Sequence, residues 1–228
     1  MLILITLFVI RKIKRRISES RLNRRISRVM MGWICLSMTI IGSDLHAQPK
    51  LDEQFKRQYE VRYNGEAKGK MWVIKKTEGG ITTIRIESDF NFRVVVPVSI
   101  KAVEEASFTK GILTYSYVDR KVNGKQKVSQ TLVARGQSYE WTGKKNKETP
   151  SYPITHSILS LYIQEPIDQL SVFSDAHGEN IPLTKIGSGK YRLDLPNGNI
   201  TYYNYTDGVC TLVEIHHSFL HIQLQLKK

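Results

Sequence analysis

The sequence predicts an all-β domain with one short helix, built as a curved antiparallel sheet or an incompletely closed β-barrel that packs around the helix. Three observations support this fold class: apolar and polar residues alternate over many segments, turn-forming residues punctuate these segments, and one apolar segment does not alternate. Alternation with a period of two is typical of strands that have one buried and one solvated face. We expect around ten strands.

The first half of the domain predicts a β-meander. Phe55 to Tyr63 alternates with a period of two, and Asn64-Gly65 supplies residues that tolerate the positive φ of a tight hairpin turn. Pro97 interrupts an apolar face that runs into Val94–Val96. Because proline cannot donate to a strand ladder, we expect a sheet edge, a bulge or a sharp bend there. The expected strands are 55–63, 70–76, 82–96, 103–108, 112–118, 127–134 and 139–141.

A change of pattern between Pro150 and Pro166 predicts the helix. Its apolar residues do not alternate, and Thr155 or Ser157 is suited to cap a helical turn. We expect a helix near 155–163 that covers the apolar face of the sheet or plugs the mouth of a partly closed barrel. Strands are then expected at 171–174, 181–186, 191–195, 199–205, 209–216 and 221–226.

Residues 1–47 have the layout of a leader with a signal peptide. A basic stretch from Arg24, a 13-residue apolar run from Val29 to Ile41 and the tripeptide Leu45-His46-Ala47 follow one another in order. The run is shorter than the roughly 20 apolar residues that span a membrane. We therefore expect cleavage after Ala47 and a single exported β-rich domain over 48–228, in the periplasm or outside the cell.

A second apolar run, Met1 to Ile10, leaves two interpretations of the N-terminal segment open. In the first, translation begins downstream, so that residues 1–23 are a mis-annotated start. In the second, the segment is an uncleaved inner-membrane anchor, and the protein contacts the membrane only through its leader.

Composition excludes some function classes. Of the 34 basic residues, nine lie in the leader, which leaves 25 basic and 19 acidic residues and a net charge of +6 for the exported part. That surplus is ordinary for a soluble domain. Nucleic-acid binding would need basic residues interleaved with aromatic residues along one face, and the sequence has no such pattern. Cys210 is the only cysteine beyond the leader, so no intramolecular disulfide can form, and its strand-like surroundings predict a buried thiol.

No catalytic or cofactor-binding signature is present. His156-Ser157, with Asp168, Asp175 and His177 downstream, lacks the Gly-x-Ser-x-Gly turn of a nucleophilic serine. Glu104 and Glu105 are adjacent in a strand, so they point to opposite faces and cannot flank one bond. We expect no catalytic residue, no cofactor and no enzymatic activity.

The histidine cluster is His216, His217 and His221. Two histidines four residues apart share one face of a helix, but in a strand the same spacing separates them by about 13 Å. The alternating pattern of this segment therefore predicts no metal site.

Tyrosines and the predicted helix suggest a ligand cleft. Tyrosines in such strands are most simply core residues whose hydroxyls reach solvent, but a curved sheet can also line an apolar cleft with them. The candidate cleft residues are Tyr115, Tyr117, Ile158, Leu161, Tyr162 and Tyr203.

Five segments support a resemblance to a known family: YEVRYNG at 59–65 with GKM at 69–71, residues 117–124, ITHSILSLY at 154–162 with Glu165-Pro166, VFS at 172–174 and KYRLDLP at 190–196. Together they resemble an uncharacterised family of secreted proteins from Bacteroidota, a domain of unknown function, over nearly all of residues 53–228. The plan is also similar to periplasmic proteins in which an unclosed β-barrel surrounds a helix, such as the lipoprotein carriers. This resemblance implies a fold and, by analogy alone, a hydrophobic ligand.

Two functions remain open from the sequence. In the first, the domain binds a lipid or another apolar or amphipathic small molecule between sheet and helix. In the second, it is a cell-envelope interaction scaffold with a solid core and no ligand, which recognises an envelope protein through an exposed edge strand near Pro97 or at the C-terminal strand. An apolar cavity of several hundred cubic ångströms favours the first.

Overall fold

One antiparallel sheet makes up the domain. The computed structural model describes residues 53–93, 97–143, 150–217 and 220–227, all of which belong to the unit formed by residues 47–228. The predicted leader, residues 1–47, lies outside the described residues. The strands are β1 (Glu53–Tyr63), β2 (Glu66–Glu78), β3 (Ile81–Arg93), β4 (Pro97–Thr109), β5 (Ile112–Val122), β6 (Lys125–Arg135), β7 (Ser138–Thr142), β8 (Ser171–Ser174), β9 (Glu179–Gly187), β10 (Lys190–Asp194), β11 (Ile200–Thr206), β12 (Val209–His217) and β13 (Leu220–Leu226).

The strand order is β7-β6-β5-β4-β3-β2-β1-β13-β12-β11-β10-β9-β8. Two meanders therefore meet where the first strand pairs with the last, in a register that runs from Tyr59 opposite Leu226 to Tyr63 opposite Ile222. Strands β7 and β8 are the two ends of this order and do not pair with each other, so the barrel is unclosed. The predicted fold class is confirmed. Each of the 13 strands in the described residues overlaps an expected segment, although β4 begins at Pro97 rather than at 103 and the estimate of around ten strands was too low.

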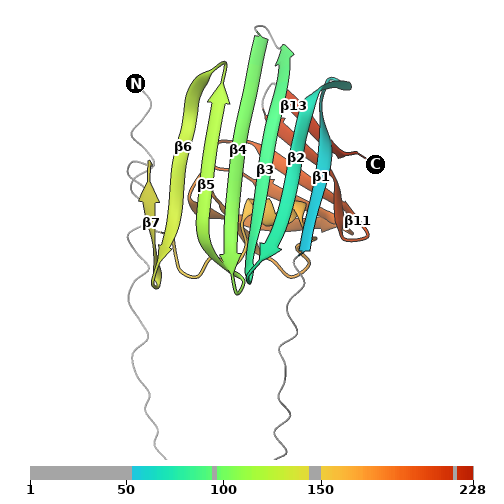
Figure 1. Cartoon of the computed structure of the whole chain (residues 1–228). Coiled ribbons are helices and arrows are strands. Elements are labelled where there is room, and N and C mark those ends of the chain that lie inside the picture. The colour runs from blue at the N-terminus through green and yellow to red at the C-terminus, as the bar shows by residue number, and fades with distance from the viewer. Residues whose placement is uncertain (1–52, 94–96, 144–149, 218–219, 228) are drawn as a thin grey trace, which may run out of the picture. The chain divides into compact units, whose positions relative to one another are not determined.

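The sheet curves so that its two halves face each other. Figure 1 shows β1–β7 as one wall, with β11 and β13 in the wall behind it and the orange connecting segment between them. Alternate residues of each strand point into this interior, as the buried Tyr59 and Val61 of β1 and the buried Met71 and Val73 of β2 illustrate. The core therefore lies between the walls, where period-two patterning predicts it.

The predicted helix near 155–163 is only a 3₁₀ turn, η1 (Ile158–Tyr162). The residues before it form hydrogen bonds with strands. The Ile154 carbonyl accepts a hydrogen bond from the backbone N–H of Leu113 in β5 (2.8 Å), and the His156 carbonyl accepts one from the backbone N–H of Phe173 in β8 (2.9 Å). Because these carbonyls serve the sheet, they are not available to an α-helix. The prediction was right about a non-strand apolar segment inside the barrel and wrong about its length and type.

Pro97 is not at a sheet edge. It is the first residue of β4, which pairs with β3 on one side and β5 on the other. A missing N–H is tolerated at the first residue of a strand, which explains why proline is found there. The C-terminal strand β13 is also interior, between β1 and β12. The two strands expected to recognise a partner through a free edge, near Pro97 and at the C-terminus, are therefore both interior strands. Val94–Val96 lie outside the described residues.

The edges that do exist approach each other through side chains. The rings of Trp141 in β7 and Phe173 in β8 stack with their centroids 6.4 Å apart. Ser157 also forms a parallel bridge with Phe173, so the connecting segment covers the free edge of β8. Among the residues that the structure describes, no helix is long and apolar enough to cross a membrane.

Candidate functional site

A cavity of about 470 Å³ lies between the two walls of the sheet. This volume is within the range of roughly 300–1,000 Å³ that is typical of small-molecule sites. Its lining is mainly apolar and comes from both meanders and from η1, with Met71, Ile86, Phe90, Ile215 and Leu224 among the contributors. The interior is therefore not solid.

Strand alternation selects which residues face this cavity. In β12 and β13, Ile215, His217, Leu220, Ile222 and Leu224 line it, whereas His216, His221 and Gln223 point to the outer face. On β4 the lining residues are Ile100, Ala102 and Glu104. Because Glu104 faces inward, its neighbour Glu105 is on the outer face, where it accepts a hydrogen bond from Arg85 at 2.9 Å. The expected separation of the two glutamates is confirmed.

The 3₁₀ turn forms part of the cavity wall. Ile158, Leu159 and Tyr162 line the cavity, and Leu161 is buried beside them. Two long-range hydrogen bonds hold the turn in place: the Tyr205 hydroxyl donates to the Leu161 carbonyl (2.6 Å), and Arg57 donates to the Tyr162 carbonyl (3.2 Å). These bonds satisfy carbonyls that so short a helix leaves unpaired.

Three buried tyrosines, Tyr59, Tyr162 and Tyr203, form a cluster beside the turn, here called the tyrosine cluster. Tyr162 packs edge-on against Tyr59 and Tyr203, with ring centroids 5.9 and 5.8 Å apart. The Tyr59 hydroxyl donates to the Cys210 carbonyl at 2.7 Å. Burial raises the pKa of all three phenols well above the ordinary tyrosine value, so they stay neutral. Tyr162 and Tyr203 line the cavity, so the cluster presents an uncharged, aromatic surface there through these two rings.

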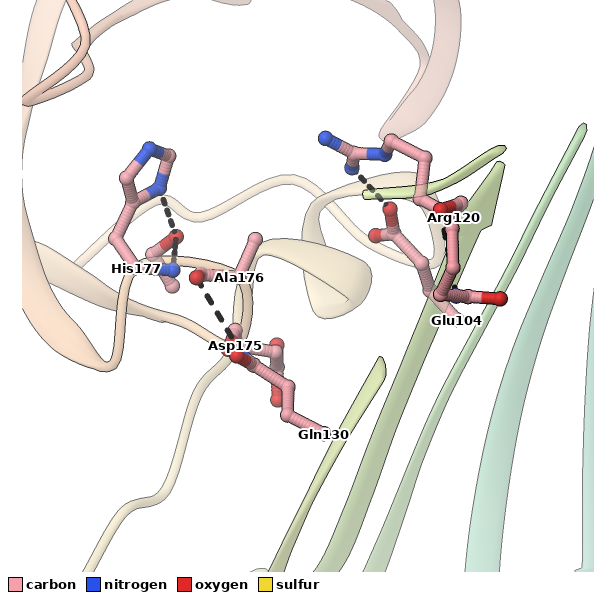
Figure 2. A network of polar contacts seen from close by, with 8 residues as sticks. Glu104, Arg120, Gln130, Asp175, Ala176 and His177 are labelled. Carbon is pink, nitrogen blue, oxygen red and sulfur yellow. Dashed lines mark hydrogen bonds and ion pairs between the residues drawn. The ribbon is translucent and has the colours of Figure 1, made fainter. Parts of the chain in front are cut away.

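An ion pair faces the cavity from β4 and β5, in the wall opposite Tyr203. Arg120 on β5 donates to Glu104 on β4 across 2.5 Å, and both side chains are partly buried. Figure 2 shows this ion pair. Both residues line the cavity. A charged pair among apolar residues supplies both a hydrogen-bond donor and an acceptor in a partly desolvated setting, where such groups bind polar atoms more strongly than in water.

The turn between β8 and β9 adds further polar groups and links the walls (Figure 2). The Ser116 hydroxyl donates to the buried Asp175 carboxylate, and the Gln130 side chain donates to the Asp175 carbonyl. The Ser174 hydroxyl contacts His177 Nδ1 at 2.9 Å and accepts from the His177 backbone N–H at 3.3 Å. Residues 174–177 line the cavity, so this turn is one side of the site.

The structure brings together only part of the predicted cleft. Ile158, Tyr162 and Tyr203 line the cavity. Leu161 is buried but does not line it, and Tyr115 and Tyr117 lie on the outer face of β5, because Ser116, Val118 and Arg120 take the inward positions. A bulge at Ser107/Phe108 shifts the phase at the start of β5. A shared face was predictable, but the sequence pattern did not indicate which face was buried.

Several residues of the site were missed by sequence reasoning. The Glu104–Arg120 pair and the 174–177 turn had no motif, but one signal existed: Glu104 is in phase with Ile100 and Ala102, so it predicts a charge on the buried face. Of the serine and histidine residues considered from the sequence, His177 contacts Ser174 and not Ser157. Ser157 is fully buried at the start of η1, where its N–H donates to the Ser160 hydroxyl at 3.3 Å.

Cys210 is fully buried in β12, as expected. Burial raises the pKa of its thiol to about 12. The thiol is therefore inert at neutral pH, and it plays a packing role next to the tyrosine cluster.

Comparisons with known proteins describe a family without an assigned function. No curated protein matches the chain. Among solved structures, a beta-barrel-like protein of domain of unknown function DUF1849 from Brucella abortus is similar with a TM-score of 0.45 and 9% sequence identity, over 76% of this chain and 95% of that chain. The family model described as "Domain of unknown function (DUF6134)" matches residues 59–227, which is most of the chain and nearly all of the sheet. The chain therefore belongs to the DUF6134 family.

Proposed function

We propose that the protein is an exported carrier that binds one apolar or amphipathic small molecule, such as a lipid, inside the barrel. The observation that supports this function is the cavity of about 470 Å³, whose lining is mainly apolar. A domain that served only as a scaffold would gain stability by filling such a space, because an unfilled apolar cavity costs packing energy.

The distribution of polar groups favours an amphipathic ligand. Tyr162, Tyr203 and the apolar residues of β12 and β13 that line the cavity would contact a hydrocarbon chain. The Glu104–Arg120 pair would lie against a polar head, because Arg120 can donate and Glu104 can accept. Sites of this kind combine an apolar lining with a few fixed polar groups that orient the ligand.

The polar groups of the 174–177 turn also favour binding over catalysis. Ser174 makes its contacts within one turn, and Asp175 uses its carboxylate and carbonyl to join that turn to β5 and β6. These contacts are structural. Export is proposed from the signal-peptide layout of residues 24–47, and the carrier would then act in the periplasm or outside the cell.

The test is native mass spectrometry of the protein purified from the periplasm of a bacterial host, followed by organic extraction and lipid analysis. We expect a stoichiometric adduct that dissociates on denaturation, and the extract then identifies the ligand class. A ligand-free mass, together with no uptake of offered fatty acids or phospholipids, would contradict the carrier function and favour the envelope scaffold.

A further inference from the structure

Three metal-ligating side chains meet on the outer face of the β12–β13 hairpin. They are Glu214 and His216 of β12 and His221 of β13. Their ligand atoms all lie within 4.8 Å of one another. This group lies outside the cavity, because Ile215, His217, Leu220 and Ile222 take the inward positions of the same two strands.

The hairpin register produces this arrangement. His216 is directly opposite His221, and their ring centroids are 4.2 Å apart. Glu214 is two residues before His216, so it projects from the same face, and its Oε1 lies 3.5 Å from His221 Nε2. Side chains directly opposite each other in an antiparallel pair have Cβ atoms about 5 Å apart, which allows two imidazoles to share one ion.

The close approach of His216 and His221 does not follow from their spacing in the sequence. The distance of about 13 Å applies to two histidines in one continuous strand. Here β12 ends at His217 and β13 begins at Leu220, so the chain reverses between the histidines. The two histidines that meet are His216 and His221, whereas the two that are four residues apart are His217 and His221.

We propose that Glu214, His216 and His221 bind a divalent transition-metal ion, with Zn²⁺ as the best match. Two imidazoles and one carboxylate form a known zinc donor set, in which water completes the coordination. Zinc bonds of about 2.0–2.1 Å place tetrahedral ligand atoms about 3.4 Å apart, so modest side-chain rotation closes the present spacing. Nitrogen donors favour Zn²⁺ over Mg²⁺ or Ca²⁺, which prefer oxygen.

Neighbouring residues support this arrangement. Gln223, opposite Glu214 in the register, donates from its side-chain amide to Glu214 Oε1 at 3.3 Å. Tyr202 of β11 packs edge-on against His216, with ring centroids 5.2 Å apart. Groups that hold metal ligands in place typically account for about 10–100-fold in metal affinity. Gln223 and Tyr202 are positioning residues for this site.

The bound ion would keep a coordination position open to solvent. The His221 side chain is 46% exposed and Glu214 27% exposed, so water can reach the ion from outside the sheet. The ion would also connect the last two strands next to the hairpin tip.

The experiment is isothermal titration of the tag-free protein with Zn²⁺, paired with Co²⁺ titration followed by visible absorption, which reports nitrogen coordination and geometry. We expect one ion per chain. His216→Ala and His221→Ala should each weaken Zn²⁺ binding by at least about tenfold, and Glu214→Gln, which keeps the side-chain volume, should weaken it measurably. His156→Ala removes a histidine far from the hairpin in sequence and is the matched control.

Circular dichroism of each variant separates loss of the site from loss of the fold. The Glu214→Gln variant and the wild-type titration keep the test decisive if a histidine variant does not fold. The proposal is wrong if the folded wild-type protein shows no stoichiometric Zn²⁺ binding. It is also wrong if His156→Ala lowers the affinity as much as His216→Ala, because the histidines would then contribute without forming one site.

Discussion

Replacing Ala102 by leucine tests whether the cavity holds the ligand. Ala102 lines the cavity from β4, where its cross-strand neighbours are Ser88 on β3 and Arg120 on β5. Two small side chains, Ser88 and Ala102, are therefore next to each other on the cavity wall. Leucine at position 102 adds three carbon atoms to this space, which a ligand that fills the cavity can no longer occupy.

The expected loss follows from the volume that the new side chain takes. If three methylene groups of the ligand lose their buried position, binding weakens by about 2.4 kcal/mol, at about 0.8 kcal/mol for each group. That free energy corresponds to about 50-fold in the dissociation constant. The assay is displacement of the apolar fluorophore N-phenyl-1-naphthylamine by tetradecanoate, with Ala67→Leu as the control, because Ala67 is exposed on β2.

Two results would refute this reasoning. If Ala102→Leu and the wild type bind tetradecanoate equally, the ligand lies outside the cavity. If Ala67→Leu weakens binding as much as Ala102→Leu, the effect does not depend on the cavity. Thermal unfolding of both variants shows that any loss of affinity is not a loss of fold.

Three further predictions concern stability and reactivity. Gly69→Ala should destabilise the protein by about 1–3 kcal/mol in denaturant titration, because a Cβ there would overlap with Phe90. Gly187→Ala should have little effect, because a Cβ there would contact only the Lys190 side chain, at an ordinary van der Waals distance of 3.8 Å. Equal effects of the two substitutions would contradict this prediction. Burial raises the pKa of the Cys210 thiol to about 12, so Cys210 should resist a thiol reagent at pH 8 until denaturant is added. Labelling of Cys210 in the native protein would disprove its burial. The tyrosine cluster should lower the free energy of unfolding above pH 10. The three phenols ionise there in the unfolded chain, but they stay protonated in the folded protein because their folded pKa values are higher. The free energy of unfolding therefore falls by up to about 1.4 kcal/mol per pH unit for each phenol. Phenolate absorbance should then rise together with loss of circular dichroism, and phenolate that forms in the folded protein would argue against the cluster.

The strands were predictable because one face of each is buried. The period-two pattern from Phe55 to Tyr63 and the Asn64-Gly65 turn predict a hairpin, and β1 and β2 pair in this way. The positive φ of Asn64 and Gly65 shows why these residues occur there. Pairing between β1 and β13 was not predictable, because it joins segments about 160 residues apart and depends on how the whole sheet curves.

The site was less predictable than the fold. The apolar positions of η1 identified Ile158 and Tyr162, and Tyr203 is in phase with the buried residues of β11. Tyr115 is in phase with outward residues, and only the bulge at the start of β5 and the pairing of β4 establish this. Polar contacts across the barrel, such as Ser116 with Asp175, depend on tertiary structure and leave no local pattern.

The two proposed sites share one hairpin, and this makes their relation measurable. In β12, Ile215 faces the cavity, whereas its neighbours Glu214 and His216 face outward. An ion that joins β12 to β13 would stabilise the pairing that holds Ile215 and Ile222 in the cavity wall. Coupling between two binding sites is reciprocal, so Zn²⁺ must change ligand affinity by the same factor by which the ligand changes Zn²⁺ affinity. Measuring tetradecanoate affinity with and without Zn²⁺ therefore shows whether the hairpin links the two sites, and a factor of one would show that each site works alone.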